Sequence, residues 1–432
     1  MMKTDKNMTR EINRRTFLKQ SALAAAILST LPALGCISTG QKKTILLCSS
    51  WQTFNIGDIA HTPGVLTIFE RFLPDVKVIL WPHDVGNGVK EILEKRFPNV
   101  PIVQTDKEIE DAFIEADLFV HGSGPSLVGR RNMRRWKEET GKPYGVYGIT
   151  FPGIYVARDA KATPSPLDIE LLNNAAFAFF RDSGSLEIAK ETGITCPIME
   201  FGPDGTFAVD LQNEEAAITF LKEHGLEEGK FMCCIPRYRY TEEWLAKGKN
   251  RPYVQENVDI NNKMKHHDNG PLREAITRIV RETDMKILIC PEDETHVALG
   301  KSLILDHLPE DVKEQVVWRD RYWLTDEALS TYKRSAGLFG LEMHSPIICV
   351  GQGIPAVVCR FYEQTTKGYM WRDIGLGDWL FDMDIPEEVE KIVPTILSIA
   401  RDPAAAKRKA LKAKEYVEKR QRETTAIIAD HL

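Results

Sequence analysis

The chain has 432 residues, a formal net charge of −6 and 43% hydrophobic residues, the composition of an ordinary globular protein long enough for two domains. The mildly acidic balance and the lack of a basic stripe interleaved with aromatic residues argue against a nucleic-acid partner. Beyond the N-terminal region, no stretch stays apolar over the length that a membrane span needs.

The first forty residues predict a targeting signal and not a part of the fold. The stretch NRRTFLK (13–19) contains an arginine pair and is followed by the short apolar run SALAAAILSTLPALG. This pattern is similar to a bacterial twin-arginine export signal, so we expect export through the Tat translocon to the periplasm or cell envelope. The small residues before Cys36 also allow lipidation there, which would anchor the protein. The alternative is a basic amphipathic helix.

Most of the eight cysteines lie in apolar runs, where buried free thiols are expected. No Cys-x-x-Cys pair is present, so neither a zinc site nor a redox motif is indicated, and we expect no metal and no cofactor. The six cysteines in apolar runs are Cys48, Cys233, Cys234, Cys290, Cys349 and Cys359.

From residue 42 onward, apolar runs typical of buried strands alternate with helical patterns, which predicts parallel strands joined by crossover helices. In the first half, the expected strands lie within 44–50, 76–82, 100–103, 117–124, 141–149 and 175–185, and the helices within 62–72, 88–97, 106–116 and 185–194.

The pattern restarts after an acidic passage at 204–215. The expected strands of the second half are 231–236, 285–291, 316–320, 337–341 and 355–361, and the expected helices are 271–283 and 325–335. Thr325 is expected to cap the second of these helices. The polar stretch 237–269, which includes His266, His267 and Asp268, is interpreted as a long solvated loop.

The predicted fold class is therefore α/β, with two Rossmann-like domains facing a cleft. We expect the N-terminal domain over 41–212, the C-terminal domain over 213–385, and helices rich in Ala, Lys and Glu over 386–432. In such sheets ligands bind outside the carboxyl ends of the strands, so the residues that follow each strand are the candidates for a site.

Two loops after strands of the first half are rich in glycine and polar residues. Asn55, Gly57 and Asp58 follow the first strand and open a helix, where exposed N–H groups suit an anion. The second loop follows the strand at 117–120 and contains His121, Gly122 and Gly124. For either loop taken alone, a simple turn that needs glycine is the competing interpretation.

The second half adds charged residues at its strand ends. Arg237 and Arg239 follow the strand 231–236 and can bind a carboxylate or phosphate in a bidentate way, although two solvated arginines would look the same in sequence. Glu342 and His344 follow the strand 337–341, between two apolar runs. Without further information, His344 is equally well interpreted as an imidazole held by backbone groups.

Taken in order, these segments resemble the polysaccharide pyruvyl transferases. The resemblance covers nearly the whole chain after the signal. Its segments are NIGD (55–58), ADLFVHGSG (116–124), GKPYGVYGI (141–149), FRDSGSLEIAKETGI (180–194), Pro203-Asp204, the strand end 236–239, SAGLFGLEMHSPIICVGQGIPAVV (335–358), Lys367-Gly368 and IGLGDWLFD (374–382).

The resemblance implies two Rossmann-like domains similar to those of GT-B glycosyltransferases. It also implies transfer of a pyruvyl group from phosphoenolpyruvate to two hydroxyls of a glycan acceptor, which forms a ketal and releases phosphate. This reaction needs cations for the anionic donor and groups that move protons. By resemblance His344 is the family's histidine, with Ser345 beside it. Arg237 or Arg239, together with Lys367, would contact the donor.

This chain departs from the family pattern at Glu342, where the family carries an arginine two residues before the histidine. We count Glu342 with His344 as the candidate catalytic pair, although a carboxylate does not help to bind an anionic donor. Two alternatives stay open: a GT-B glycosyltransferase with a nucleotide-sugar donor, and a glycan-binding relative without catalytic activity.

Overall fold

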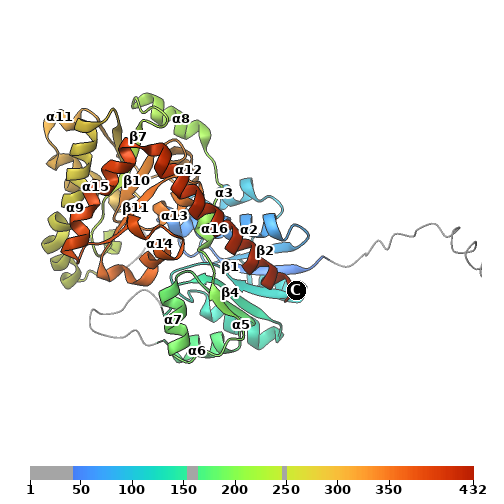
Figure 1. Ribbon diagram of the computed structural model, residues 1–432. Helices are drawn as coiled ribbons and strands as arrows, with labels where there is room; N and C mark the ends of the chain where they lie inside the picture. The colour runs from blue at the N-terminus through green and yellow to red at the C-terminus, as the bar shows by residue number, and fades with distance from the viewer. Residues whose placement is uncertain (1–41, 153–163, 246–250) are drawn as a thin grey trace, which may run out of the picture. The chain divides into compact units, whose positions relative to one another are not determined.

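The computed structural model describes residues 42–152, 164–245 and 251–432, so the predicted signal at 1–40 and Cys36 lie outside the described residues. Residues Lys43–Leu432 form one compact unit, which contains two six-stranded parallel sheets (Figure 1). The domain bounds at 212 and 385 stay predictions. Within the described ranges, no helix is both long enough and apolar enough to cross a membrane.

The first sheet has the strand order β2-β1-β3-β4-β5-β6, and every neighbouring pair is parallel. Residues along β1 alternate between two hydrophobic cores, so both faces of this sheet are covered. The strands are β1 (Thr44–Ser49), β2 (Lys77–Pro82), β3 (Leu118–His121), β4 (Tyr144–Ile149), β5 (Phe177–Phe180) and β6 (Met199–Phe201). The helices that accompany them are α2 (Ile56–Phe72), α3 (Val89–Arg96), α4 (Asp106–Glu115), α5 (Arg130–Thr140), α6 (Pro166–Asn173) and α7 (Ser183–Glu191).

The second sheet has the order β12-β11-β10-β7-β8-β9 and is also parallel throughout. Its strands are β7 (Phe231–Ile235), β8 (Lys286–Ile289), β9 (Val316–Trp318), β10 (Gly337–Gly340), β11 (Ala356–Arg360) and β12 (Leu380–Asp382). The remaining helices are α8 (Glu214–Glu223), α9 (Gln255–Glu282), α10 (His296–Leu299), α11 (Glu310–Lys313), α12 (Thr325–Tyr332), α13 (His344–Gly351), α14 (Met370–Asp373), α15 (Pro386–Arg401) and α16 (Pro403–Ala429).

The α/β fold with two Rossmann-like halves is thus confirmed, while three local predictions were wrong. The stretch 237–269 is not one long loop, because α9 runs without a break from Gln255 through Pro271. The predicted strand at 100–103 is reduced to a single bridge between Ile102 and Leu80. Thr325 does not cap α12; it is the first helical residue, and its hydroxyl donates to the Ile56 carbonyl at 2.7 Å.

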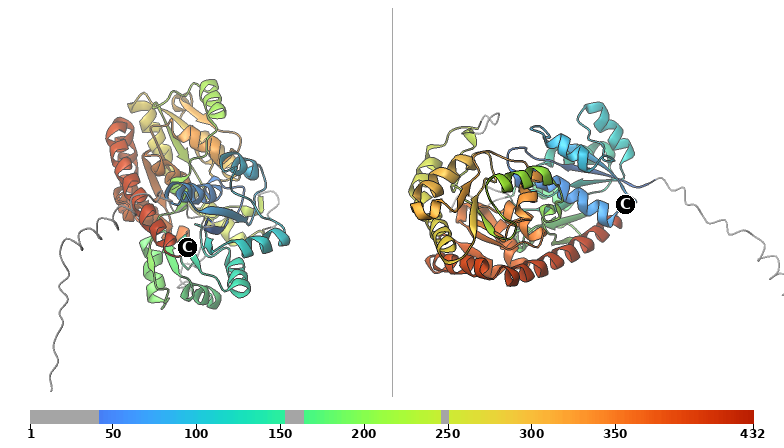
Figure 2. Two further views of the ribbon diagram at one scale, coloured as in Figure 1. Left: turned by 90° about the vertical axis from the view of Figure 1, so that its right-hand side faces the viewer. Right: turned by 90° about the horizontal axis from the view of Figure 1, so that it is seen from above.

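The helix α2 is shared by the two halves of the unit. Ile56 and Ala60 belong to the core around the second sheet, whereas Ile59 and Phe69 belong to a core of the first. Nearly the whole circumference of α2 is therefore buried. The last helix also links the halves, because α16 packs against α2 and β5 after starting beside the second sheet. Figure 2 shows α16, in dark red, ending beside the first sheet.

Candidate functional site

The predicted site segments lie at the points where the strand order of each sheet reverses. In the first sheet the order changes direction between β1 and β3, and in the second between β7 and β10. Parallel α/β sheets bind ligands outside the carboxyl ends of the strands at such points. The segments after β1 and β3, and those after β7 and β10, contain the residues that the sequence singled out, except Lys367, which follows β11.

These loops meet directly where the halves join. The Ile56 N–H donates to the Glu292 carbonyl at 3.0 Å, and the Glu294 N–H donates to the Phe54 carbonyl at 3.1 Å. Asn55 and Asp293 thereby form an isolated antiparallel bridge between segments far apart in sequence. We call the surrounding groups the seam site. They come from the start of α2, the loop after β8, and the start of α13.

The start of α2 is built by Asn55, Gly57 and Asp58. The Asn55 side chain caps the helix by accepting hydrogen bonds from the Gly57 and Asp58 N–H groups, at 2.8 and 3.3 Å. The Asp58 carboxylate accepts a hydrogen bond from the Gln52 amide. Gly57 lies directly against His344. These three predicted residues therefore belong to the seam site. Asn55 and Gly57 contribute by shaping the start of α2.

Replacing Gly57 by alanine is expected to break this contact. A Cβ atom at Gly57 would lie 1.9 Å from the His344 Cβ, so either α2 or α13 must shift. We expect a loss of about 1–3 kcal/mol in the free energy of unfolding, measured by urea denaturation. Gly270→Ala in α9 is the control, because its nearest neighbour would be 3.7 Å away; we expect it to stabilise by up to about 1 kcal/mol. Equal denaturation midpoints for Gly57→Ala and the unmutated chain would contradict this packing.

His344 is the first residue of α13 and is only 7% exposed. Its Nδ1 lies 3.3 Å from Glu292 Oε1, and its Nε2 lies 2.6 Å from Lys367 Nζ, which is positioned to donate to it. Burial, followed by the nearby Lys367, lowers the pKa of His344 well below its usual range, so the ring is neutral. Burial also lowers the pKa of Lys367 to about 8.

The partner of His344 is thus Glu292, whereas Glu342 faces elsewhere. Glu342 Oε2 lies 2.9 Å from Arg237 Nη1, and Oε1 lies 3.5 Å from His296 Nε2. Burial raises the pKa of Glu342 to about 7, against the attraction of Arg237. This carboxyl group therefore carries a proton for part of the time near neutral pH.

Glu292 also binds the backbone at the start of α13, through Ser345. Its N–H donates to Glu292 Oε2 at 2.6 Å. A helix N-terminus favours an anion, and here a carboxylate of the chain itself takes that position. The Ser345 hydroxyl pairs with the Tyr332 hydroxyl at 3.2 Å, inside the core around the second sheet. Ser345 therefore contacts the seam site through its backbone.

A buried network behind the seam site was missed from the sequence. His61 is fully buried, and its Nδ1 lies 2.9 Å from Asp204 Oδ1 and 2.7 Å from the Ser123 hydroxyl. Arg181 donates to the other oxygen of Asp204 at 2.7 Å. Burial alone would raise the pKa of Asp204, but His61 and Arg181 outweigh it and hold that pKa well below its usual range. The available signal was the spacing of His61, three residues after Asp58 on one helix face.

The loop after β3 lies inside the first half, and its predicted residues are held by protein groups. His121 Nδ1 donates to the Gly122 carbonyl at 2.8 Å, and its Nε2 accepts from the Gly129 N–H at 3.0 Å. Its ring stacks on Trp51 with centroids 4.6 Å apart. Gly124 pairs with the backbone of β4 at Ile149. A binding role for His121, Gly122 and Gly124 stays a prediction.

His121 gives a pH-dependent prediction for stability. Burial lowers its pKa to about 3, while the unfolded chain titrates near pH 6.5. Because the folded pKa is depressed, the contribution of His121 is present above pH 6.5 and is lost as the pH falls. Between pH 7.5 and 5.0 we expect it to account for about 2 kcal/mol of lost stability. Urea denaturation of His121→Gln should show a correspondingly smaller pH dependence; an unchanged one would contradict the buried neutral ring.

The two arginines after β7 have different environments. Arg237 belongs to the seam site through Glu342, and its guanidinium lies over the Phe361 ring, 5.4 Å from the centroid. Arg239 is held by Asp268 at 2.8 Å and by further carboxylates from the segments after β11 and β12. Its charge is therefore neutralised within the protein.

The charges of the seam site largely cancel. The carboxylates are Asp58, Asp204, Glu292 and Glu342, and the cations are Arg181, Arg237 and Lys367. When all are ionised, four negative groups oppose three positive ones. Among the described residues, no ion pair joins Lys367 to a carboxylate, so its ammonium is the cation left to meet an anionic ligand.

Comparison with known proteins identifies the family of this chain. The family model for polysaccharide pyruvyl transferases matches residues 55–360. Of the residues described at the seam site, Gln52 and Lys367 lie outside this range. This chain belongs to the polysaccharide pyruvyl transferase family. No curated protein sequence matches this family member.

Solved structures share its fold at low sequence identity. HepE of Anabaena, in complex with UDP and glucose, has a TM-score of 0.57 at 11% identity, over 90% of this chain and 100% of that one. MnaA of S. aureus with UDP has a TM-score of 0.55 at 11% identity, over 89% and 95%. A UDP-GlcNAc 2-epimerase of Methanocaldococcus jannaschii has 0.50 at 14% identity, over 83% and 93%. At these identities the likeness establishes the GT-B-like arrangement of two Rossmann-like domains and nothing finer.

Proposed function

We propose that this chain transfers the pyruvyl group of phosphoenolpyruvate to two hydroxyls of a cell-envelope glycan. The observation that carries the proposal is the family match over residues 55–360, combined with the meeting of its polar segments at the seam site. In the reaction, one hydroxyl oxygen adds to the C2 carbon of the donor and gives up its proton, while the methylene carbon gains one proton from an acid, which the hydroxyl proton then restores. The second hydroxyl oxygen then displaces phosphate, which leaves with the proton of that hydroxyl, and the ketal remains.

The side chains of the seam site fit the demands of this reaction. Lys367 supplies a positive charge for the carboxylate or phosphate of the donor. Glu342 is buried and carries a proton for part of the time near neutral pH, so we assign it to protonate the methylene carbon. His344 is neutral and lies between Glu292 and Lys367, so we place it in contact with the donor. The carboxylate that departs from the family pattern thus gains a role as an acid.

A second candidate is glycosyl transfer from a nucleotide sugar. HepE and MnaA were both solved with UDP, and the present chain has their fold. In that case the loops after β7 and β10 would contact the nucleotide. The family match favours pyruvyl transfer, and the two functions differ in the donor that the protein binds.

The test is phosphate release from phosphoenolpyruvate by the purified chain over a panel of galactoside and N-acetylmannosamine acceptors. We expect release that depends on the acceptor, together with a pyruvylated product in mass spectrometry. Thermal stabilisation by UDP and none by phosphoenolpyruvate would instead favour glycosyl transfer. Binding of acceptor glycans by folded protein, without turnover of either donor, would support the glycan-binding relative and overturn both enzymatic functions.

We further propose that the protein acts in the cell envelope, after export through the Tat translocon. The support is the arginine pair Arg14-Arg15 and the apolar run before Cys36. Replacing both arginines by lysine should retain the protein in the cytoplasm, as measured by fractionation. Labelling with a fatty acid that requires Cys36 would establish the lipid anchor. Unchanged export of the double variant would contradict the proposed route.

A further inference from the structure

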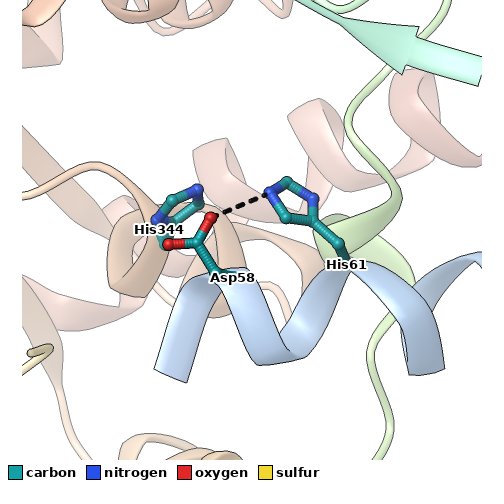
Figure 3. Close-up of side chains that lie close together, drawn as sticks. All are labelled: Asp58, His61 and His344. Carbon is teal, nitrogen blue, oxygen red and sulfur yellow. Dashed lines mark ion pairs between the residues drawn. The ribbon is translucent and has the colours of Figure 1, made fainter. Parts of the chain in front are cut away.

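Three side chains that can bind a metal ion meet at the seam site. Asp58 and His61 lie on one face of α2, and His344 comes from the start of α13 (Figure 3). One potential ligand atom from each lies within 4.8 Å of those from the other two. The two imidazole rings are perpendicular, with centroids 5.2 Å apart. Two elements from opposite halves of the chain therefore supply a donor set of two nitrogens and one oxygen.

Both imidazoles are oriented by buried carboxylates. His61 Nδ1 lies 2.9 Å from Asp204 Oδ1, and His344 Nδ1 lies 3.3 Å from Glu292 Oε1. Histidines that bind metals almost always donate one ring N–H to a carboxylate or carbonyl, which fixes the tautomer and leaves the other nitrogen for the ion. In both rings the remaining nitrogen is Nε2.

The Nε2 atom of His61 needs a partner. It is fully buried and accepts or donates no hydrogen bond among the described residues. Asp58 Oδ1 lies 3.9 Å from it, the contact dashed in Figure 3. In the neutral tautomer of His61 that carries its proton on Nδ1, next to Asp204, the Nε2 lone pair faces the Asp58 carboxylate, and a cation between these two electron-rich groups stabilises both.

We propose that Asp58, His61 and His344 bind one divalent ion of the Zn²⁺ class, with a fourth position open to substrate. Two imidazoles and one carboxylate suit Zn²⁺ and its first-row neighbours better than Mg²⁺ or Ca²⁺, which prefer oxygen ligands. Bond lengths of about 2.0–2.2 Å require the three side chains to draw together by roughly 1 Å. Lys367 Nζ, now 2.6 Å from His344 Nε2, would turn away from that atom.

Such an ion would change the charge of the seam site. The carboxylates of the site outnumber its cations by one when all are ionised, which is unfavourable for phosphoenolpyruvate. A divalent ion reverses this balance and can polarise a phosphoryl or carboxyl oxygen at its open position. This catalytic use of the ion rests on the proposed function, whereas the binding of the ion does not.

The test measures metal binding by the full chain in the absence of donor and acceptor. After treatment with a chelator, reloading with Zn²⁺ and desalting, elemental analysis should find about one ion per chain. Competition with a chromogenic chelator should show at least about 100-fold weaker binding for His61→Gln and for Asp58→Asn. His224→Gln is the matched control, because His224 is exposed and ends α8 outside the site; its affinity should equal that of the unmutated chain.

Two results would overturn the metal site: a folded, unmutated chain that retains no Zn²⁺, or His61→Gln binding as tightly as the unmutated chain. Circular dichroism of each variant shows whether it is folded, and Co²⁺ absorption provides a second readout of the ligand set. Metal binding without phosphate release over the acceptor panel would support the site and contradict pyruvyl transfer. Equal phosphate release with and without the ion would support pyruvyl transfer and contradict a catalytic ion.

Discussion

Replacing His344 by asparagine is expected to lower acceptor-dependent phosphate release by about 100-fold or more. Asparagine keeps a polar side chain but cannot reach both Glu292 and Lys367, which the imidazole joins at 3.3 and 2.6 Å. Lys367 would lose the partner that positions it, and a displacement of about 1 Å near a reacting centre can cost about 100-fold in rate. The measurement is initial phosphate release at saturating and at limiting phosphoenolpyruvate.

The control for this prediction is again His224→Gln, which should leave the rate unchanged. Thermal unfolding of His344→Asn should show a folded protein, because asparagine is polar and smaller than histidine and so adds no steric clash. If the variant keeps more than a tenth of the activity, the reacting centre lies elsewhere in the chain. If only the KM for phosphoenolpyruvate rises and kcat is kept, His344 contributes to binding of the donor and not to the chemical step.

The strand ends could be predicted from the sequence because they follow from a local pattern. Short apolar runs followed by glycine or polar residues indicate where a buried parallel strand ends. In an α/β sheet these ends lie at one edge, so Asp58 and His344 were found although they are far apart in sequence. The reversal of strand order at β1/β3 and β7/β10 explains why these particular loops are the ones that converge.

The pairing of the charges could not be predicted, because it depends on side-chain directions across the two halves. Glu342 precedes His344 by two residues, yet it points to Arg237, and the histidine is paired by Glu292 from the loop after β8. His61 lies within a helix whose other residues are nearly all buried, so it looks like a core residue in sequence. Only the fold brings Asp204 against it.

The cancellation of charge follows from this pairing. It changes how the two arginines after β7 are interpreted. From the sequence, Arg237 or Arg239 was a candidate to bind an anion, with two solvated arginines as the alternative, and both arginines pair with carboxylates of the chain. An arginine whose charge is already balanced by a buried carboxylate offers less net positive charge to an added anion. Lys367 lacks such a partner among the described residues, and it is therefore the cation whose removal should weaken donor binding most.

The largest effect on stability is expected at Arg181, which neutralises the buried Asp204 behind the seam site. Arg181 is 2% exposed and Asp204 is fully buried, and they pair at 2.7 Å. Arg181→Met leaves the carboxylate without the guanidinium that pairs with it, and breaking a buried pair in this way typically costs about 3–5 kcal/mol. The hydrogen bond from Arg181 Nε to the Thr150 hydroxyl, at 2.7 Å, is lost as well. Urea denaturation measures this cost.

A double-mutant cycle separates the ion pair from simple loss of packing. Asp204→Asn removes the charge that Arg181 neutralises, so adding Arg181→Met to it should cost at least about 1 kcal/mol less than Arg181→Met alone. Arg281→Met is the surface control: Arg281 pairs with Asp311 at 2.9 Å in an exposed position, and its loss should cost far less than the loss of Arg181. Additive costs for Arg181 and Asp204 would show that the network is held by packing. A coupled cost would show that Arg181 and Asp204 stabilise each other as charges, and Asp204 is the carboxylate that lies 2.9 Å from His61 Nδ1.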